Sequence, residues 1–403
     1  MTFKPSLNAV LFPIAGEGLR GKQSSFRITE PGQNRKSTCG RESDRWKISV
    51  FLFVVLSFAV FSQGCAGPVQ AKGTADPPPP ATPVDSQLSA CNSAACNVQL
   101  AAGDFTFSTQ IHSQTTIHIS GAGASYNNAG PHCMTTLTWT GGGSIPFVFD
   151  SYTQSGSQLY GFCLNATGAA PPVFIDVDQS AGDVHINDIV IDTPTTKAQI
   201  AAIRWGNTAE VAAAKCTDVF IRAAAPIGYD VLDVGAHFMG LRCRGVWNDE
   251  HEWVIGDSGH MAESFHCVFC TAEASSGNTP VVILNAKEFS WSEGYTEGEI
   301  AFDIPASATK AEAVTISNNW ASGGGDNKVS AMVRSALPTA TVTVSGNEII
   351  GDGYIVEDDM LAKATVIGNS MPGAAVAKNG GKVCAFGNAA TLAGSKPATG
   401  FCN

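Results

Sequence analysis

The chain has 403 residues and a formal net charge of −11 at pH 7, which is enough for one large domain or two of ordinary size. Residues 1–65 carry nine Lys or Arg and four Asp or Glu, so the remainder has 24 − 9 = 15 basic and 35 − 4 = 31 acidic residues and a net charge of −16. A surface this acidic argues against nucleic acid as a partner. The abundant glycine and sparse charge favour a β-solenoid over a helical protein.

Residues 1–65 are predicted to be a leader that contains a signal segment. The apolar, uncharged stretch 48–61 follows Arg45 and Lys47 and is short for a membrane span, as is typical of a signal peptide. Cys65 follows small residues and resembles the lipidated cysteine of a bacterial lipoprotein, although Ser62 stands where such sites usually have Leu. We therefore expect an exported protein held on the membrane of the cell envelope by a lipid at Cys65. Ordinary secretion and an uncleaved signal anchor are the alternatives.

Residues 66–88 are predicted to be a stiff, extended tether, because they contain the run Pro77 to Pro80 and a further proline at 83. Such a tether would hold a domain away from a membrane. The folded domain is then expected to span residues 89–403.

Eight short segments repeat one frame, in which an apolar residue or a cysteine recurs every 22–30 residues. Side chains alternate between the two faces of a strand, so this column should face inward and its neighbours should face solvent. A strand repeat of this length predicts a solenoid in which each coil packs on the next. The inward column consists of Ile186, Cys216, Cys243, Cys267, Trp291, Ile316, Val344 and Val366.

Three residues after each inward position, a second column is predicted to occupy a turn. It ends in stacked asparagines, which tolerate the left-handed backbone of a turn. Similar frames upstream are centred on Ile117, Leu137 and Leu159. The fold class predicted is all-β, a single-stranded right-handed parallel β-helix of about eleven coils, spaced about 4.8 Å apart. An antiparallel sandwich is the alternative. The turn column reads Ile189, Val219, Val246, Cys270, Gly294, Asn319, Asn347 and Asn369.

Ten cysteines remain beyond Cys39 and Cys65, and an even number in an exported chain indicates disulfides. Cys91 with Cys96, and Cys384 with Cys402, are predicted to clasp the two ends of the solenoid, where capping is needed. The stacked Cys216, Cys243 and Cys267 could be disulfide-bonded or simply small buried residues. A zinc or redox role for the pair Cys267 and Cys270 is disfavoured, because no second such pair exists.

Residues 100–375 resemble the right-handed β-helix proteins of the pectate lyase superfamily, including tailspike-like members. The resemblance rests on the opening text TTIHISGAGAS (115–125) and TTLTWTGGG (135–143), on the later frames TISNN, TVSGN and TVIGN, and on WSEGYTEG (291–298). It implies the architecture and carries no catalytic signature. This fold hosts lyases, hydrolases, adhesins and binding rods.

The predicted frame places several basic residues on one outer strip of the solenoid. Stacked like charges repel, so their gathering in an acidic protein suggests a polyanion such as a uronic-acid polymer. β-Elimination on uronates requires a base and neutralisation of the carboxylate. The candidates for these roles are Lys215, Arg242, Arg244 and His266. Nearby acids could instead neutralise the strip. Its members are Lys215, Arg242, Arg244, His266 and His185.

The segment 247–263 is expected to be a charged return loop and is the second candidate site. Its carboxylates Asp249, Glu250 and Glu252 could act as the acid and base of a glycoside hydrolase. Trp247, Trp253 and His251 could bind sugar rings, and a calcium site is an open alternative. The alternative interpretation is that 247–263 is a solvated charged loop without a function. On the next repeat, Trp291 is expected in the core and Glu293 in the turn column.

Three functions therefore remain open from the residues alone. The chain could bind and cleave an acidic polysaccharide with lyase-type chemistry, or serve as a non-catalytic surface adhesin or structural rod. It could also hydrolyse glycosides with carboxylates of 249–263. The residues establish no cofactor, and calcium is a possible one.

Overall fold

The computed structural model describes residues 80–127, 129–178, 183–274, 277–323, 328–358, 363–378 and 383–391. The signal segment, Cys65 and most of the predicted tether lie outside these ranges. No helix within them is long and apolar enough to cross a membrane.

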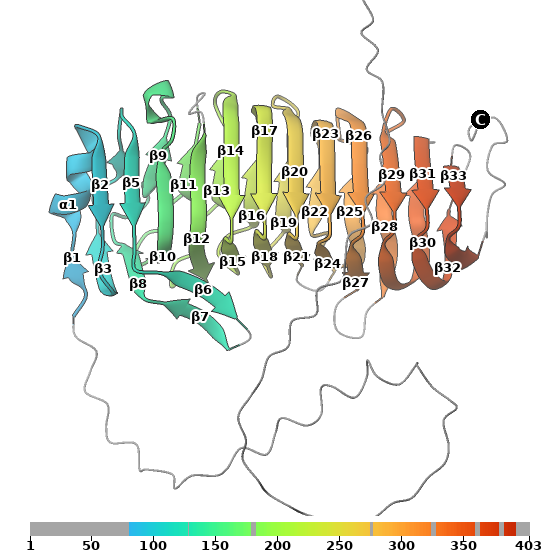
Figure 1. The fold of residues 1–403 in the computed structure, drawn as a ribbon, viewed down its shortest axis with the longest axis horizontal. Coiled ribbons are helices and arrows are strands. Elements are labelled where there is room, and N and C mark those ends of the chain that lie inside the picture. The colour runs from blue at the N-terminus through green and yellow to red at the C-terminus, as the bar shows by residue number, and fades with distance from the viewer. Residues whose placement is uncertain are drawn as a thin grey trace, which may run out of the picture. The chain divides into compact units, whose positions relative to one another are not determined.

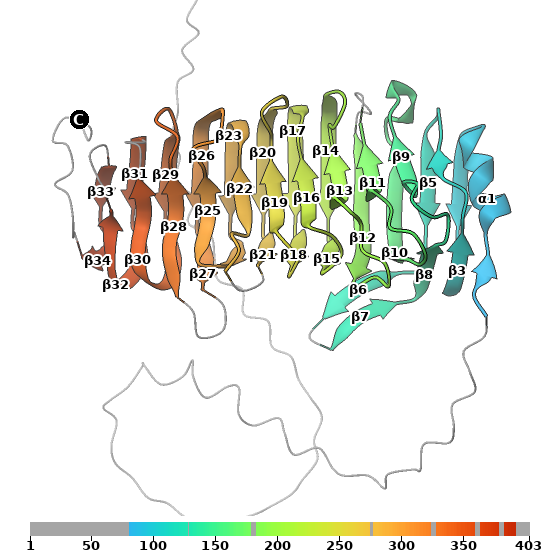
Figure 2. The ribbon, with the colours of Figure 1, turned by 180° about the vertical axis from the view of Figure 1, so that it is seen from behind.

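The described residues form a single-stranded parallel β-helix of about ten turns (Figure 1), close to the eleven coils expected. Among the described strands, only β6 (Ala124–Asn127) and β7 (Gly130–Cys133) pair in an antiparallel manner. The sandwich alternative is therefore wrong. The other strands build three parallel ladders along the axis (Figure 2).

The first ladder carries most of the repeat frame. Its strands, in order along the axis, are β2 (Cys96–Gln99), β5 (Ile117–Ser120), β10 (Gln158–Ala166), β12 (Val184–Asp192), β14 (Val211–Thr217), β17 (Val234–Leu241), β20 (Ala262–Val268), β23 (Asn285–Ser292), β26 (Lys310–Ser317), β29 (Thr341–Ser345), β31 (Lys363–Ile367) and β33 (Val383–Phe386).

The second ladder follows the first after a tight corner, and β10 and β12 extend through that corner into it. Its other strands are β1 (Thr82–Pro83), β3 (Gly103–Phe107), β8 (Thr135–Trp139), β15 (Phe220–Arg222), β18 (Arg244–Val246), β21 (Thr271–Glu273), β24 (Tyr295–Glu297), β27 (Trp320–Ser322), β30 (Glu348–Asp358), β32 (Ser370–Ala377) and β34 (Ala389–Thr391).

The third ladder closes each coil, and β30 and β32 extend into it. Its other strands are β4 (Ile111–His112), β9 (Phe147–Phe149), β11 (Val173–Val177), β13 (Ala201–Trp205), β16 (Ile227–Val231), β19 (His251–Ile255), β22 (Val281–Ile283), β25 (Ile300–Ile304) and β28 (Val329–Ser335).

One end of the solenoid is capped by the helix α1 (Asp85–Ser89) and the short 3-10 helix η1 (Ala90–Asn92), while a second 3-10 helix, η2 (Tyr152–Gln154), lies between β9 and β10. Leu88 of α1 is buried, and β1 pairs with β3. The folded part therefore begins before Ser89, and the last residues assigned to the tether belong to the solenoid.

The lumen is filled by aliphatic side chains and by aromatic rings that stack from coil to coil. Phe238, Phe265 and Phe289 are fully buried, and their ring centroids lie 4.9 and 5.0 Å apart with nearly parallel planes. Burying one such side chain contributes about 1.5–3 kcal/mol, and stacking adds to it. Trp291 is also fully buried, as predicted.

The predicted inward column is confirmed at seven of its positions and wrong at Cys243. Cys216 pairs with Gly240, and Gly240 pairs with Cys267. Cys243 lies three residues further on and beyond the corner, where it shares a column with Val219 and Cys270. The sequence frame favoured Cys243 because it is apolar and glycine is not, but only Gly240 fits beside the sulfurs of the next coil.

Upstream, Leu159 aligns with Ile186 as expected, but its other partner is Ile119 instead of Ile117. Leu137 belongs to β8 in the second ladder, so its frame does not continue the first one.

The corner between the first two ladders is made by a residue in the left-handed region. Asp218, Arg242, Phe269 and Glu293 have φ values of 54–56° there, and glycine takes the position in the last coils. The predicted asparagine stack follows it: the side-chain amides of Asn319, Asn347 and Asn369 are buried and hydrogen-bond one another in series, and the partly buried Asn388 extends the series. The stack is confirmed, but the left-handed residue precedes it.

Four disulfides join described cysteines. The clasp Cys91–Cys96 is confirmed. Cys384 is disulfide-bonded, and Cys402 lies outside the described residues. The stacked cysteines, left open by the sequence, are not free thiols, and Cys267 bonds within its own coil. The remaining pairs are Cys133–Cys163, Cys216–Cys243 and Cys267–Cys270.

Candidate functional site

The register separates the basic residues that were expected to form one strip. His185, Lys215 and His266 do share the outer face of the first ladder, but Met239 stands between the last two. Arg242 occupies the corner, and Arg244 begins the second ladder. The predicted five-residue strip is therefore wrong. The error arises because the sequence frame was centred on Cys243, three residues after Gly240, which occupies the inward position.

The three residues that remain on that face are already paired with neighbouring polar groups. Asp183 Oδ1 lies 2.8 Å from Lys215 Nζ and 3.0 Å from His185 Nε2. The hydrogen bonds from Lys215 and His185 hold the pKa of Asp183 below its usual value. His266 contacts Ser290 Oγ at 2.6 Å and Ser264 Oγ at 2.9 Å. This face offers no concentrated positive charge to a polyanion.

The segment 247–263 is not a charged loop, because β19 runs through its centre. Trp253 is a core residue instead of a sugar platform, and Glu252 is also fully buried. Glu252 accepts hydrogen bonds from the Asn248 backbone N–H at 3.0 Å and from Asn248 Nδ2 at 2.5 Å. Burial raises the pKa of Glu252 to about 8.

The other candidates of that segment do not converge on a site either. Asp249 is ion-paired with Lys197 at 2.7 Å, Glu250 is exposed, and His251 Nδ1 contacts the Thr279 carbonyl at 2.8 Å. Trp247 is half exposed and sits at a second corner. No group of three or more His, Cys, Asp or Glu in the described ranges could hold a metal ion.

The candidate site that the structure supports lies instead on the outer face of the second ladder, beside the hairpin β6–β7. In register from coil to coil, one outward column reads Cys163, Val190, Phe220, Arg244, Thr271, Tyr295, Trp320 and Glu348. The first three are apolar and buried, and from Arg244 onward the column becomes largely polar and aromatic.

The hairpin lies beside the neighbouring coils (Figure 1) and packs on the apolar part of this column. Tyr126 of β6 stacks on Phe220 with ring centroids 3.6 Å apart and planes within 7°. Arg222 Nη1 donates to Tyr126 Oη at 2.9 Å, and the Cys133–Cys163 disulfide ties β7 to β10. The hairpin therefore has a small core of its own, separate from the lumen.

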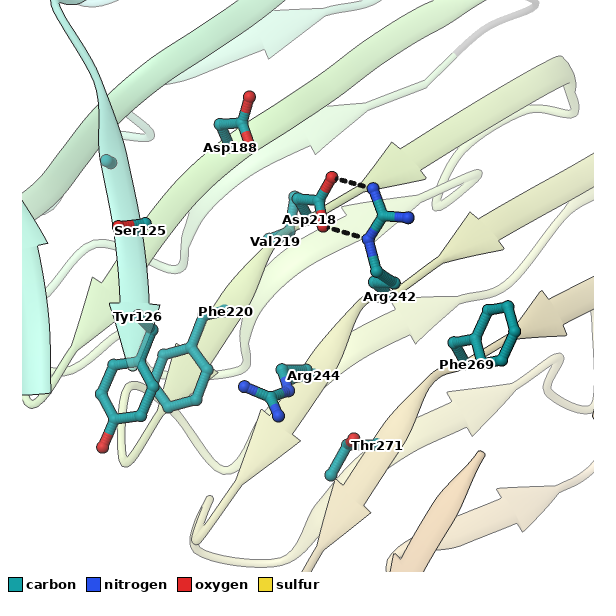
Figure 3. Close-up of a pocket in the computed structure, with 11 residues that line it drawn as sticks. Ser125, Tyr126, Asp188, Asp218, Val219, Phe220, Arg242, Arg244, Phe269 and Thr271 are labelled. Atoms are coloured by element: carbon teal, nitrogen blue, oxygen red, sulfur yellow. Dashed lines mark hydrogen bonds and ion pairs between the residues drawn. The ribbon is translucent and has the colours of Figure 1, made fainter. Parts of the chain in front are cut away.

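A groove opens where the hairpin ends. It encloses a cavity of about 450 Å³ between β6, the corner residues and the second ladder (Figure 3). Arg242 Nε and Nη2 each donate to Asp218 at 2.5 Å, which occupies that guanidinium. Burial and the neighbouring Asp218 carboxylate raise the pKa of Asp188. The exposed ring of Phe269 extends this wall of the groove.

Arg244 lines this hollow and also the neighbouring one that reaches Trp247 and Glu273. In the described part of the chain, its guanidinium has no ion pair or hydrogen bond, and the residue is exposed. The other described arginines are all paired with a carboxylate, namely Arg204 with Asp176, Arg222 with Asp192, Arg242 with Asp218 and Arg334 with Asp303.

On the coils beyond the groove, the outer face of the second ladder is aromatic and acidic. Tyr295 and Trp320 pack with centroids 5.0 Å apart, and Trp320 is 48% exposed. Glu273 and Glu297 occupy the same rung of adjacent coils. Burial, and then Glu297, raise the pKa of Glu273, while Tyr295 Oη donates to Glu297.

Sequence reasoning found Arg242, Arg244 and Trp247 but missed Tyr126, Phe220, Glu273 and Glu297 as parts of one site. The hairpin had a readable signal, since Tyr126 is followed by Asn-Asn-Ala-Gly, a turn composition. Nothing local showed that this hairpin reaches a strand almost 100 residues later.

The chain matches no protein-family model, and comparison with curated proteins and with solved structures finds no match. The parallel β-helix fold is what is shown, and the likeness to the pectate lyase superfamily remains a resemblance.

Proposed function

We propose that this protein binds a polysaccharide in the groove beside the hairpin β6–β7, with an acidic sugar at Arg244. The observation that carries the proposal is that Arg244, alone among the described arginines, has no ion pair, and that aromatic rings wall its groove. A guanidinium donates two parallel hydrogen bonds to a carboxylate, and such charge-assisted pairs are stronger than neutral ones. Exposed aromatic faces such as Trp320 suit the apolar faces of sugar rings.

The charges of the groove narrow the class of polymer. Glu273, Glu293 and Glu297 lie on the coils that follow Arg244, and like charges at short range repel. A uniformly acidic uronan would meet these carboxylates at successive sugars. A polymer in which acidic and neutral sugars alternate would meet Arg244 with its carboxylate and the glutamates with hydroxyl groups.

Export to an oxidising compartment, with attachment to the membrane through Cys65, is part of the proposal. The disulfides among the described cysteines support it, because such bonds persist outside the cytosol.

Binding is tested with Arg244→Ala and the matched control Lys215→Ala, which removes a cation already paired with Asp183. The ligands are hyaluronan, in which uronic acid alternates with a neutral sugar, other acidic heteropolysaccharides, polygalacturonate and neutral dextran. Calorimetry at low salt should show that Arg244→Ala weakens binding to the best heteropolysaccharide about tenfold or more, since a bond to a charged group contributes about 1.5–3 kcal/mol. Equal binding by both variants would remove Arg244 from the site.

A second candidate function is hydrolysis of the bound polymer by Glu273 and Glu297. The favouring observation is the pairing of a carboxyl with a raised pKa and a second carboxylate on the next coil, which is how glycosidases divide the acid and base roles. Glu273, protonated, would donate its proton to the glycosidic oxygen as the C–O bond breaks, and Glu297 would assist attack by water.

Product analysis separates cleavage from binding and from the lyase alternative. Hydrolysis would release reducing ends without an unsaturated sugar, and Glu273→Gln would abolish it while binding persists. An unsaturated product would indicate the lyase reaction. Binding without any product would leave the non-catalytic adhesin or rod.

A further inference from the structure

The outward column that contains Arg244 has one covered end and one open end. Cys163, Val190 and Phe220 continue the column of Arg244 in one direction, and the hairpin covers all three of them. The rings of Tyr126 and Phe220 touch face to face at 3.6 Å, so no sugar ring fits between them.

In the other direction Thr271 is buried, and the column is uncovered beyond it. Tyr295 is partly exposed, Trp320 is 48% exposed and Glu348 is exposed. Arg244 is thus the first exposed position of this column next to the Tyr126–Phe220 stack, while the hollow beside the stack continues along β6 past Asp218 to Asp188 (Figure 3). A chain that lies along this column, and not along the corner residues, can continue only toward the C-terminal coils.

We infer that the groove receives the end of a polysaccharide chain and not its interior. This inference rests on the proposed function. The terminal acidic sugar meets Arg244 with the Tyr126–Phe220 stack behind it, and the following sugars pass over Thr271, Tyr295 and Trp320. The hairpin is then the element that determines specificity, and Tyr126 is a positioning residue that blocks further passage.

Chain length tests the inference. Fragments of the tightest-binding heteropolysaccharide are compared at equal mass concentration, all of them longer than the groove. Tenfold shorter chains present tenfold more ends, so the dissociation constant expressed per sugar residue should fall about tenfold. A constant that does not change with length would overturn end recognition and leave the proposed function intact. Absence of binding to every polymer would overturn both.

Tyr126→Ala supplies a second measurement, because it opens the wall while the Cys133–Cys163 disulfide keeps the hairpin tied to β10. Long chains should gain affinity relative to short ones, so that the length dependence decreases. Tyr152→Ala removes an exposed tyrosine from η2, outside the groove, and should keep the wild-type length dependence. The same length dependence in Tyr126→Ala as in the wild type would contradict the assigned role of the wall.

Discussion

Gly240 lies directly against the Cys267–Cys270 disulfide: a Cβ atom at position 240 would come within 2.5 Å of Cys267 Sγ and 3.2 Å of Cys270 Sγ. The disulfide is fully buried, so neither sulfur can move away into solvent.

Gly240→Ala should therefore destabilise the protein by about 1–3 kcal/mol, the usual cost of overpacking a tight core. Chemical denaturation under non-reducing conditions would measure it. Gly143→Ala is the matched control, because its added methyl group would meet nothing closer than 3.8 Å. Equal stability of the two variants would show that the coils adjust to the extra atom without cost.

Glu252 should make stability depend on pH. Its pKa is raised to about 8 by burial, whereas an unfolded glutamate ionises near 4.5. Between these values the native state holds a proton that the unfolded state has lost, so the free energy of unfolding falls as pH rises, by at most about 1.4 kcal/mol per unit.

Glu252→Gln removes this titration at the cost of one hydrogen bond, since its amide cannot accept from Asn248 Nδ2. The free energy of unfolding of the wild type, minus that of the variant, should decline between about pH 5 and 8 and stay level below pH 4. Taking the difference cancels other groups such as Asp230, whose pKa burial raises to about 7. A flat difference over that interval would mean that Glu252 is ionised in the native state.

Asn347, in the middle of the amide stack, should be costly to lose. Its Oδ1 accepts from the Asn319 backbone N–H and Nδ2 at 2.9 and 3.0 Å, and its Nδ2 donates to Asn369 and to the Ile316 carbonyl. Asn347→Ala leaves these buried groups without partners, each at a cost of about 1–3 kcal/mol.

Asn388→Ala provides the comparison for thermal unfolding, because Asn388 ends the stack and is only partly buried. We expect a clearly larger fall in the unfolding midpoint for Asn347→Ala. The reverse order would indicate that the stack does not act as a connected unit.

Trp320 should contribute to binding through its exposed ring. Trp320→Ala is expected to weaken binding of the heteropolysaccharide several-fold, because a lost stacking contact is worth about 0.5–1.5 kcal/mol. Met239→Ala, on the first ladder and similarly exposed, should leave affinity unchanged. Calorimetry with both variants checks this, and ligand quenching of tryptophan fluorescence should decrease only in Trp320→Ala.

The β-helix could be predicted because its inward column repeats in the sequence. Ile186, Trp291 and Val344 are apolar because every coil fills the lumen with a side chain at this position. The asparagine stack is visible in the sequence as a run of asparagines in one column. The register failed at Gly240, where the inward position is occupied by a residue that has no side chain. An apolar pattern cannot distinguish that position from the nearby Cys243.

The candidate site could not be predicted to the same extent, because its parts come from unrelated stretches of the chain. The shift at Gly240 moved Arg242 and Arg244 away from Lys215 and around a corner. Whether a basic residue is neutralised also depends on its neighbours on other coils. Arg242 forms an ion pair with Asp218 from the preceding coil, whereas Arg244 lies near Glu273 but forms no ion pair within the described residues. Sequence proximity carries no such information.

The hairpin β6–β7 grows from the corner between β5 and β8, a place where later coils turn within a residue or two. A covered and an uncovered sheet face thus differ by one insertion of about a dozen residues, and the coils on either side keep their pairing through β5 and β10. In a scaffold of this kind, a new ligand preference can arise by lengthening a single bend, without any change to the packed interior.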